Sequence, residues 1–318
     1  MLQGKLIEST LSYKSKQIFF VLVKLIVVIA AFYIIYAKVF NDQQLSFLNF
    51  KKNIEQTRWP IVPSLMVLVL FSFINWILEL LKWQLLAKPM REISFAESFK
   101  QSLFSLTASL ITPNRIGEYG AKALFYKKSN LKKCLSLNLI GNLSQLAVTV
   151  FFGIIGCLIL WQNYSEALGH IIGLNVFIII LIVLVFGVGA LFLLRRYRQL
   201  SYNTHSKTLL VKTLGLSLCR YVAFNLQFYV LLILFNFEID VFTALSFTSS
   251  MYLLASIIPA ISLFDVVIKG SISVYLFSLL GFNSISILSI VLIMWLLNFA
   301  IPAIIGSYFV LTFKQKLS

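Results

Sequence analysis

The stretch Ala108-Ser-Leu-Ile-Thr-Pro-Asn-Arg-Ile-Gly-Glu-Tyr-Gly-Ala-Lys122 interrupts a long apolar sequence with a proline and several charged groups. Proline has no backbone N–H and clashes with the preceding helical turn, so the incoming helix must end near Thr112. We expect Thr112 to be the N-cap of a second helix, with Pro113 at its first position. Glu118 and Lys122 then lie four residues apart on one face, in the favourable acid-first order. The sequence predicts two half-helices that meet at a polar break.

A similar pattern recurs about half a chain later. Ala255-Ser-Ile-Ile-Pro259 resembles Ala108 to Pro113 with one residue fewer, and Asp265 and Lys269 again stand four residues apart after the proline. Ser262 and Asp265 have the spacing of a capping box, so Ser262 is the expected N-cap of this second half-helix. The recurrence predicts an internal repeat.

The composition places the chain in a membrane. Hydrophobic residues make up 59% of the sequence, charged residues 12%, and the mean hydropathy is +0.91. This leaves too little polar surface for a soluble globule, and several apolar runs exceed the roughly 20 residues that a spanning helix needs. We therefore expect an all-α polytopic membrane protein with a single transmembrane domain over residues 1–318. The three cysteines show no C-x-x-C spacing, so we expect no disulfide framework, no metal and no cofactor.

The net charge of +16 is interpreted through the positive-inside rule and not as a nucleic-acid surface. Basic clusters between the apolar segments place both termini in the cytoplasm and the chain in the cytoplasmic (inner) membrane. About six full spans are expected, at about 18–39, 60–86, 135–161, 168–194, 213–235 and 285–313. The two broken segments, at about 95–126 and 242–280, are expected to be re-entrant helical hairpins. The uncleaved first span is expected to act as an anchor.

The two hairpins are expected to enter the membrane from opposite faces. Basic residues flank the first broken segment, whereas Glu238 and Asp240 precede the second without any nearby lysine or arginine. Repeats at about 18–161 and 168–313 would then have opposite topology. Interrupted helices at matching positions of an inverted repeat are typical of transporters, which bind substrate where the breaks meet.

Polar side chains on the spans are secondary candidates for substrate contact: Glu79, Asn142, Gln145, Arg220 and Asn298. Glu79 and Lys82 share a helix face, where they either form an ion pair near the inner interface or contact a ligand. The polar stripe on the third span either packs against other helices or lines a hydrated path. Arg220 either extends toward the interface or holds a phosphate.

At these residues the chain also resembles a known family. Thr112 to Glu118 after an apolar helix, the later segment Pro259 to Lys269 and the overall length are similar to the flippase-like transmembrane domain of lysylphosphatidylglycerol synthases and their stand-alone relatives. The similarity covers roughly residues 18–313. Relatives tend to have glycines and a glutamate after the second proline, whereas this chain has Ala260 to Phe264 and then Asp265. The resemblance implies movement of an aminoacylated or other polar lipid between leaflets, and it does not imply lipid synthesis, because the soluble transfer domain of the larger members is missing.

The function favoured by the sequence is translocation of a polar or anionic lipid, or of a lipid-linked substrate, across the membrane. Membrane phospholipid is the expected partner and nucleic acid is not. The candidate substrate-binding residues are Thr112, Pro113, Asn114, Arg115, Gly117, Glu118, Lys122, Pro259, Ser262, Asp265 and Lys269. One alternative is an embedded enzyme that uses Glu118 or Asp265 as a base or metal ligand, although no paired-carboxylate or Ser-His-Asp spacing occurs. The other is a non-catalytic assembly partner, in which the charged pairs only neutralise each other.

Overall fold

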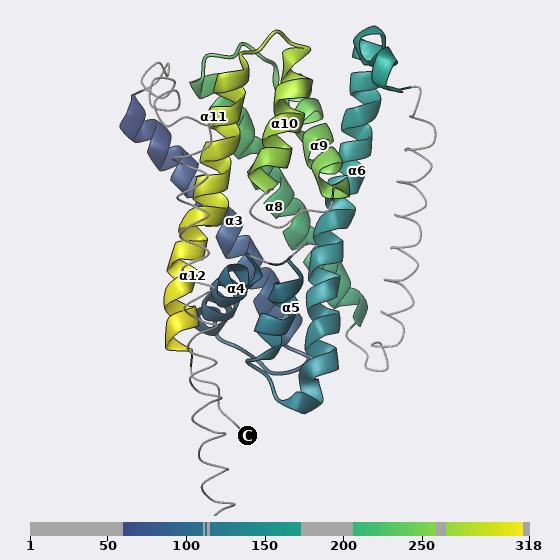
Figure 1. The fold of residues 1–318 in the computed structure, drawn as a ribbon. Helices are drawn as coiled ribbons and strands as arrows, with labels where there is room; N and C mark the ends of the chain where they lie inside the picture. The colour runs from purple at the N-terminus through teal and green to yellow at the C-terminus, as the bar shows by residue number, and fades with distance from the viewer. Residues whose placement is uncertain (1–59, 111, 113–114, 173–205, 259–264, 314–318) are drawn as a thin grey trace, which may run out of the picture.

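The computed structural model describes residues 60–110, 112, 115–172, 206–258 and 265–313 (Figure 1). This part of the chain is helical and contains no strand, which confirms the all-α class. The predicted span at 18–39 and most of the predicted span at 168–194 lie outside the described residues. Four predicted site residues also lie outside them: Pro113, Asn114, Pro259 and Ser262.

The described helices fall into two groups along the chain. The first group comprises α3 (Ile61–Ala87), α4 (Phe95–Ser109), α5 (Ile116–Ala123), the 3₁₀ turn η1 (Lys128–Asn130) and α6 (Leu131–Ile172). The second comprises α8 (Ser206–Leu234), α9 (Val241–Ile257), α10 (Asp265–Ser278), α11 (Ser284–Trp295), the π-helical turn η2 (Leu296–Ala300) and α12 (Ile301–Thr312). α6 contains a kink at Tyr164, where the backbone leaves helical geometry.

Four stretches of the described chain are long and apolar enough to cross a membrane: Val62–Ala87, Lys128–Tyr164, Lys207–Leu234 and Ser284–Thr312. They correspond to the second, third, fifth and sixth spans predicted from the sequence. Large apolar side chains are exposed along them, Met66 and Phe73 among others, as expected where the solvent is lipid and not water. The protein is therefore a membrane-embedded, multi-pass helical bundle.

Both predicted helix breaks are present. α4 ends at Ser109 and α5 begins at Ile116, whereas α9 ends at Ile257 and α10 begins at Asp265. α4 has 15 residues and α9 has 17, so at 1.5 Å per residue neither reaches the thickness of about 30 Å of a hydrocarbon core. α5 and α10 are shorter still, with 8 and 14 residues. Each pair forms a helical hairpin whose halves pack against each other.

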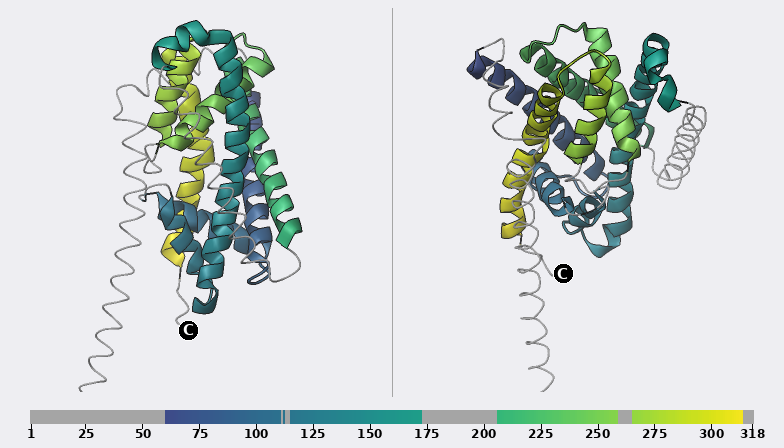
Figure 2. Two further views of the ribbon diagram at one scale, coloured as in Figure 1. Left: turned by 90° about the vertical axis from the view of Figure 1, so that its right-hand side faces the viewer. Right: turned by 45° about the horizontal axis from the view of Figure 1, so that its top comes forward.

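The two hairpins lie toward opposite ends of the bundle. In Figure 1 the α4–α5 hairpin occupies the lower half and the α9–α10 hairpin the upper half, and the second view in Figure 2 agrees. α6 runs the length of the bundle and contacts both hairpins, through α5 at one end and α9 at the other. α3 packs against α8, and α12 packs against α4.

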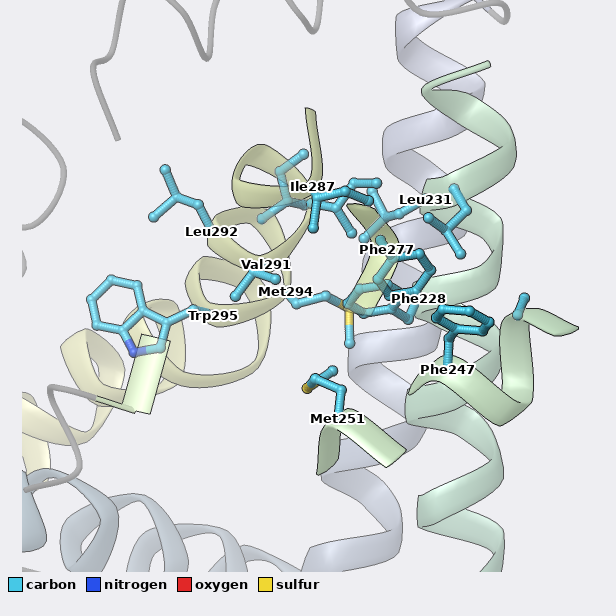
Figure 3. Close-up of a cluster of buried hydrophobic side chains, with 14 of the residues drawn as sticks. Phe228, Leu231, Phe247, Met251, Phe277, Ile287, Val291, Leu292, Met294 and Trp295 are labelled. Atoms are coloured by element: carbon cyan, nitrogen blue, oxygen red, sulfur yellow. The ribbon is translucent and has the colours of Figure 1, made fainter. Parts of the chain in front are cut away.

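The second group of helices encloses the main apolar core of the described chain (Figure 3). Its most buried side chains come from α8, α9, α10 and α11 and include Phe228, Leu231, Phe247, Met251, Phe277 and Ile290. Phe228 and Phe277 stack with ring centroids 5.8 Å apart. Tight apolar packing fixes the α9–α10 hairpin against its neighbours. The interior around the α4–α5 hairpin is different, because charged side chains are buried there.

Candidate functional site

Thr112 joins the two halves of the first hairpin. Its hydroxyl donates to the carbonyl of Ser109 at 2.8 Å and accepts from the backbone N–H of Gly117 at 2.9 Å. The prediction that Thr112 is the N-cap is wrong, because the N-cap of α5 is Arg115, in the left-handed conformation with φ of 57°. The hydroxyl nevertheless satisfies a free N–H of the first turn from outside the helix, which is the task of a capping side chain.

Gly117 is required at this break by close packing. A Cβ at this position would lie 2.9 Å from Cγ2 of Thr112, which is closer than real Cβ contacts, and 3.0 Å from the carbonyl oxygen of Ala108, which is closer than nearly all of them. Gly120, one turn later, has open space around it. Gly117 therefore permits Thr112 and Ala108 to approach the start of α5 closely. This close approach explains why a glycine stands at this place in the stretch from Thr112 to Glu118.

Glu118 and Lys122 form the predicted ion pair, with Lys122 Nζ 2.8 Å from Glu118 Oε1. Both side chains are enclosed by protein, with exposed fractions of 6% and 2%. Lys122 also donates to Oδ1 of Asn138 on α6 at 2.8 Å and lies over the ring of Trp83 on α3, 4.2 Å from its centroid. Three helices thus surround the lysine ammonium group.

A second charged group lies on α3 beside this pair. Lys82 Nζ is 2.7 Å from Glu79 Oε2, which confirms the predicted pairing, and the lysine side chain is only 3% exposed. Arg220 on α8 donates to the same carboxylate through Nη1 and to Oδ1 of Asn75 through Nε, at 2.7 Å. Lys122 interacts electrostatically with both Glu79 and Lys82. These five charged residues, Glu79, Lys82, Glu118, Lys122 and Arg220, form one buried charge cluster.

A chain of amide side chains extends the cluster toward the middle of the bundle. Asn75 donates to Asn298 at 3.0 Å, Asn298 donates to Gln227 at 2.9 Å, and Gln227 donates to Ser72 at 2.8 Å. Asn298 lies in the π-helical turn η2, four residues before Pro302. Since proline has no N–H to donate, the carbonyl of Asn298 is left for another donor, and Trp76 Nε1 binds it at 3.2 Å.

The polar stripe on α6 serves as a packing surface in the described structure. Asn142 donates to the hydroxyl of Tyr119 on α5 at 3.1 Å, and Gln145 donates to the carbonyl of Ser217 on α8 at 3.4 Å. Further along the stripe, a Cβ on Gly156 would lie 2.6 Å from a backbone oxygen of α9. Of the two interpretations drawn from the sequence, these contacts favour helix packing.

The second hairpin has a more open charged pair. Lys269 Nζ lies 2.6 Å from Asp265 Oδ2, as predicted, but the two side chains are 31% and 40% exposed. Lys269 also lies 5.6 Å from the ring centroid of Tyr252 on α9. Arg115 at the first break is similarly open, with 41% of its side chain exposed and Nε 3.8 Å from Glu118. Among the described residues, the bonds of Asp265 and Lys269 do not join those of the charge cluster.

Lys82 and several residues beside the cluster are not among the candidates chosen from the sequence. The sequence places Asn75 and Lys82 on the same helix face as Glu79 without making either a candidate, and Trp83 and Gln101 are not singled out. Trp83 Nε1 donates to Gln101 Oε1 at 2.8 Å, so the indole is fixed beneath Lys122. The available signal was the spacing of polar residues on α3, at positions 72, 75, 79 and 82, which repeats every three or four residues.

The model of a family described as the lysylphosphatidylglycerol synthase TM region matches residues 21–306, which is nearly the whole chain. No curated protein matches the chain. The match includes both hairpins and all five members of the charge cluster, so the described site lies inside the region that the family shares.

Proposed function

The chain belongs to the lysylphosphatidylglycerol synthase TM region family, and on this premise we propose that it translocates a polar or anionic lipid between the leaflets of a membrane. The observation that carries the proposal is the placement of the two broken hairpins. Each break is followed by an acid and a lysine four residues apart, and the hairpins lie at opposite ends of the bundle (Figure 1). Interrupted helices at matching positions point to the substrate site of inverted-repeat transporters.

We assign the first contact with the lipid phosphate to Arg115 and Lys269. These two cations stand next to the breaks and are 41% and 31% exposed, so a headgroup can reach them. A guanidinium group suits a phosphate because its N–H donors match the spacing of two phosphate oxygens. The N–H of Gly117 already binds Thr112, so at the first break the side chain of Arg115 is a better donor than the helix start.

Three further predicted contacts, Glu118, Lys122 and Asp265, have a different role in this proposal. Lys122 is enclosed and holds Glu118, while Glu118 also lies 3.8 Å from Arg115. Protonation of Glu118 or Asp265 would weaken its lysine pair and release the adjacent cation for the headgroup. Movement of the lipid would then be linked to proton uptake at the two breaks. The proposed location is the cytoplasmic membrane, with both termini in the cytoplasm.

Reconstitution tests the proposal against the two alternatives. The protein is placed in vesicles that contain a fluorescent anionic lipid, and the fraction of label reached by an impermeant quencher is followed over time. Loss of the protected inner-leaflet signal supports translocation. A new lipid product on chromatography, without exchange, supports an embedded enzyme. If the protein gives no exchange and no new product, the assembly partner is supported. Vesicles with Arg115→Gln should exchange more slowly than those with Lys212→Gln, which changes an exposed lysine near the start of α8.

A further inference from the structure

The buried charge cluster carries more positive than negative charge. Lys82, Lys122 and Arg220 contribute three positive charges, whereas Glu79 and Glu118 contribute two negative ones, which leaves one positive charge in excess. All five side chains are at most 14% exposed. An uncompensated charge in a low-dielectric interior is unfavourable by several kcal/mol, so a buried cluster of this kind requires a counter-charge.

The sequence around the cluster offers no acid for this purpose. Within the membrane segments expected for the whole chain, including those at 18–39 and 168–194 that lie wholly or mostly outside the described residues, the acids are Glu79, Glu97, Glu118 and Asp265. Glu97, at the start of α4, has an exposed side chain and already pairs with Arg91 at 2.8 Å. Asp265 already pairs with Lys269 at 2.6 Å. The segment at 18–39 instead adds two further lysines, Lys24 and Lys38. The counter-charge must therefore come from outside the membrane-spanning sequence.

Hydrogen-bond donors remain available at the same place. Asn138 is 2% exposed and binds Lys122 through Oδ1, yet its Nδ2 has no partner among the described residues. The ion pair with Glu79 uses one of the three N–H donors of Lys82, and the two bonds of Arg220 use Nε and Nη1 but not Nη2. A buried donor without an acceptor is costly, and here the unpaired Nδ2 of Asn138 lies beside the excess charge.

We propose that Lys82, Lys122 and Arg220 bind one singly charged phosphate oxyanion between α3, α5, α6 and α8. Such a group supplies one negative charge and several acceptor oxygens, which are the two things that the cluster lacks. The phosphodiester of an anionic lipid and free dihydrogen phosphate share this chemistry. The site adjoins Arg115 at the first break through Glu118, but it is formed by other cations, and its occupation does not depend on whether the protein translocates lipid.

The test measures thermal stability of the full chain in an uncharged detergent after lipid removal. One arm adds sodium phosphate against sodium gluconate at equal ionic strength, and the other adds phosphatidylglycerol against phosphatidylcholine. A ligand that binds only the folded protein raises Tm in a saturable way. A rise with phosphate identifies the free anion, and a rise with phosphatidylglycerol alone identifies the lipid. Absence of any rise in both arms overturns the proposal.

Matched variants connect the effect to the cluster. Lys82→Met removes the excess charge, so its apparent affinity for the anion should fall about ten- to a hundredfold while its Tm without anion stays at or above that of the wild type. Lys88→Met changes an exposed lysine at the end of the same helix and should respond like the wild type. An unchanged response of Lys82→Met would show that the anion binds elsewhere.

A measurement on the wild type alone covers the case in which Lys82→Met does not fold. Native mass spectrometry of the protein released from mild detergent should show one retained phosphate or one retained anionic lipid per chain. Retention of no anion would contradict the proposal and indicate that one of the buried lysines is neutral. Because no step of these experiments involves transport, a negative result here leaves the proposed function to be decided by the vesicle assay.

Discussion

Glu79 on α3 and Arg220 on α8 form an ion pair between residues that are 141 positions apart in the chain. The pair connects the two groups of helices at the level of the α4–α5 hairpin, because Glu79 also binds Lys82 and interacts with Lys122. The first hairpin is thereby held against a charged interior, whereas the second is held by the aromatic and aliphatic core shown in Figure 3.

Removal of the shared acid is predicted to destabilise the protein strongly. Glu79→Gln leaves Lys82 and Arg220 enclosed without their carboxylate, and loss of one partner of a buried ion pair costs about 3–5 kcal/mol. The measurement is the unfolding temperature and the yield of monodisperse protein in detergent. Glu97→Gln, which breaks the exposed pair with Arg91, should cost less than about 1 kcal/mol. If the two variants lose the same amount of stability, the claim that the buried ion pair matters more than the exposed one is contradicted.

The first hairpin is predicted to be sensitive to a single added methyl group. Gly117→Ala places a Cβ against Thr112 and Ala108, so the break must open and the folded protein should lose roughly 1–3 kcal/mol. Gly120→Ala is the matched control, since nothing lies within 4 Å of the new Cβ, and it should be neutral or slightly stabilising. Thermal unfolding of both variants provides the comparison. If Gly117→Ala is as stable as Gly120→Ala, the close approach is not structural.

The hydroxyl of Thr112 is predicted to stabilise the same break. Thr112→Ala removes the acceptor for the N–H of Gly117 and should cost about 1 kcal/mol, as for a lost helix cap, whereas Thr112→Ser should retain most of the stability. The two variants differ mainly in the hydroxyl, so a similar loss of Tm in both would point to the methyl group of Thr112 instead.

The hairpin breaks follow from local chemistry, and this explains why the sequence predicts them. A proline that follows an apolar helix favours a break, as the Thr112-Pro113 sequence does here. Residues four apart meet on any helix, so the pairs Glu118–Lys122 and Asp265–Lys269 were predicted correctly. The cap at Thr112 was wrong by three residues because the left-handed backbone of Arg115 delays the helix start. Nothing in the residue type of an arginine indicates that conformation.

The pairing between distant helices could not be obtained in the same way. Periodicity places Asn75, Glu79 and Lys82 on one face of α3 but does not say which helix lies opposite that face. Arg220 and Asn298 were chosen as polar residues on apolar helices, and only the fold shows that both bind Asn75. The π-helical turn at Asn298 likewise depends on Pro302 and on Trp76 from another helix.

The membrane orientation of the two hairpins is predicted to be opposite. In a variant without Cys134, Cys157 and Cys219, single cysteines are introduced by Lys128→Cys after α5 and by Ser284→Cys at the start of α11. Both positions are exposed. Lys128 follows α5 of the first hairpin and Ser284 follows α10 of the second, and the two hairpins lie toward opposite ends of the bundle (Figure 1). In intact cells an impermeant thiol reagent should label Ser284→Cys, and Lys128→Cys should react only after the membrane is opened. Labelling of both in intact cells would exclude the proposed topology.

The stability of the start of α9, the first helix of the second hairpin, is predicted to depend on pH. Asp240 caps α9, and hydrogen bonds from Thr243 lower the pKa of its carboxyl group below the usual range. Because the pKa of Asp240 is lower in the folded state, its carboxylate adds to the free energy of unfolding at pH values above the pKa of the unfolded chain. This added stability is lost as pH falls through the pKa of the folded state. Asp240→Asn should therefore show a shallower loss of Tm toward acidic pH than the wild type or Glu238→Gln. Parallel pH profiles would contradict the capping role.

Leaflet exchange of a fluorescent anionic lipid in sealed vesicles tests the central claim most directly. The wild type should exchange the lipid well above protein-free vesicles, and Gly120→Ala should do so at a similar rate. Glu118→Gln combined with Asp265→Asn should reduce exchange to the protein-free background, because neither acid can then change charge. The comparison uses only folded, monodisperse protein, since Glu118→Gln also leaves Lys122 enclosed without its carboxylate. Exchange by the double variant at the wild-type rate, or no exchange by the wild type, would contradict the account.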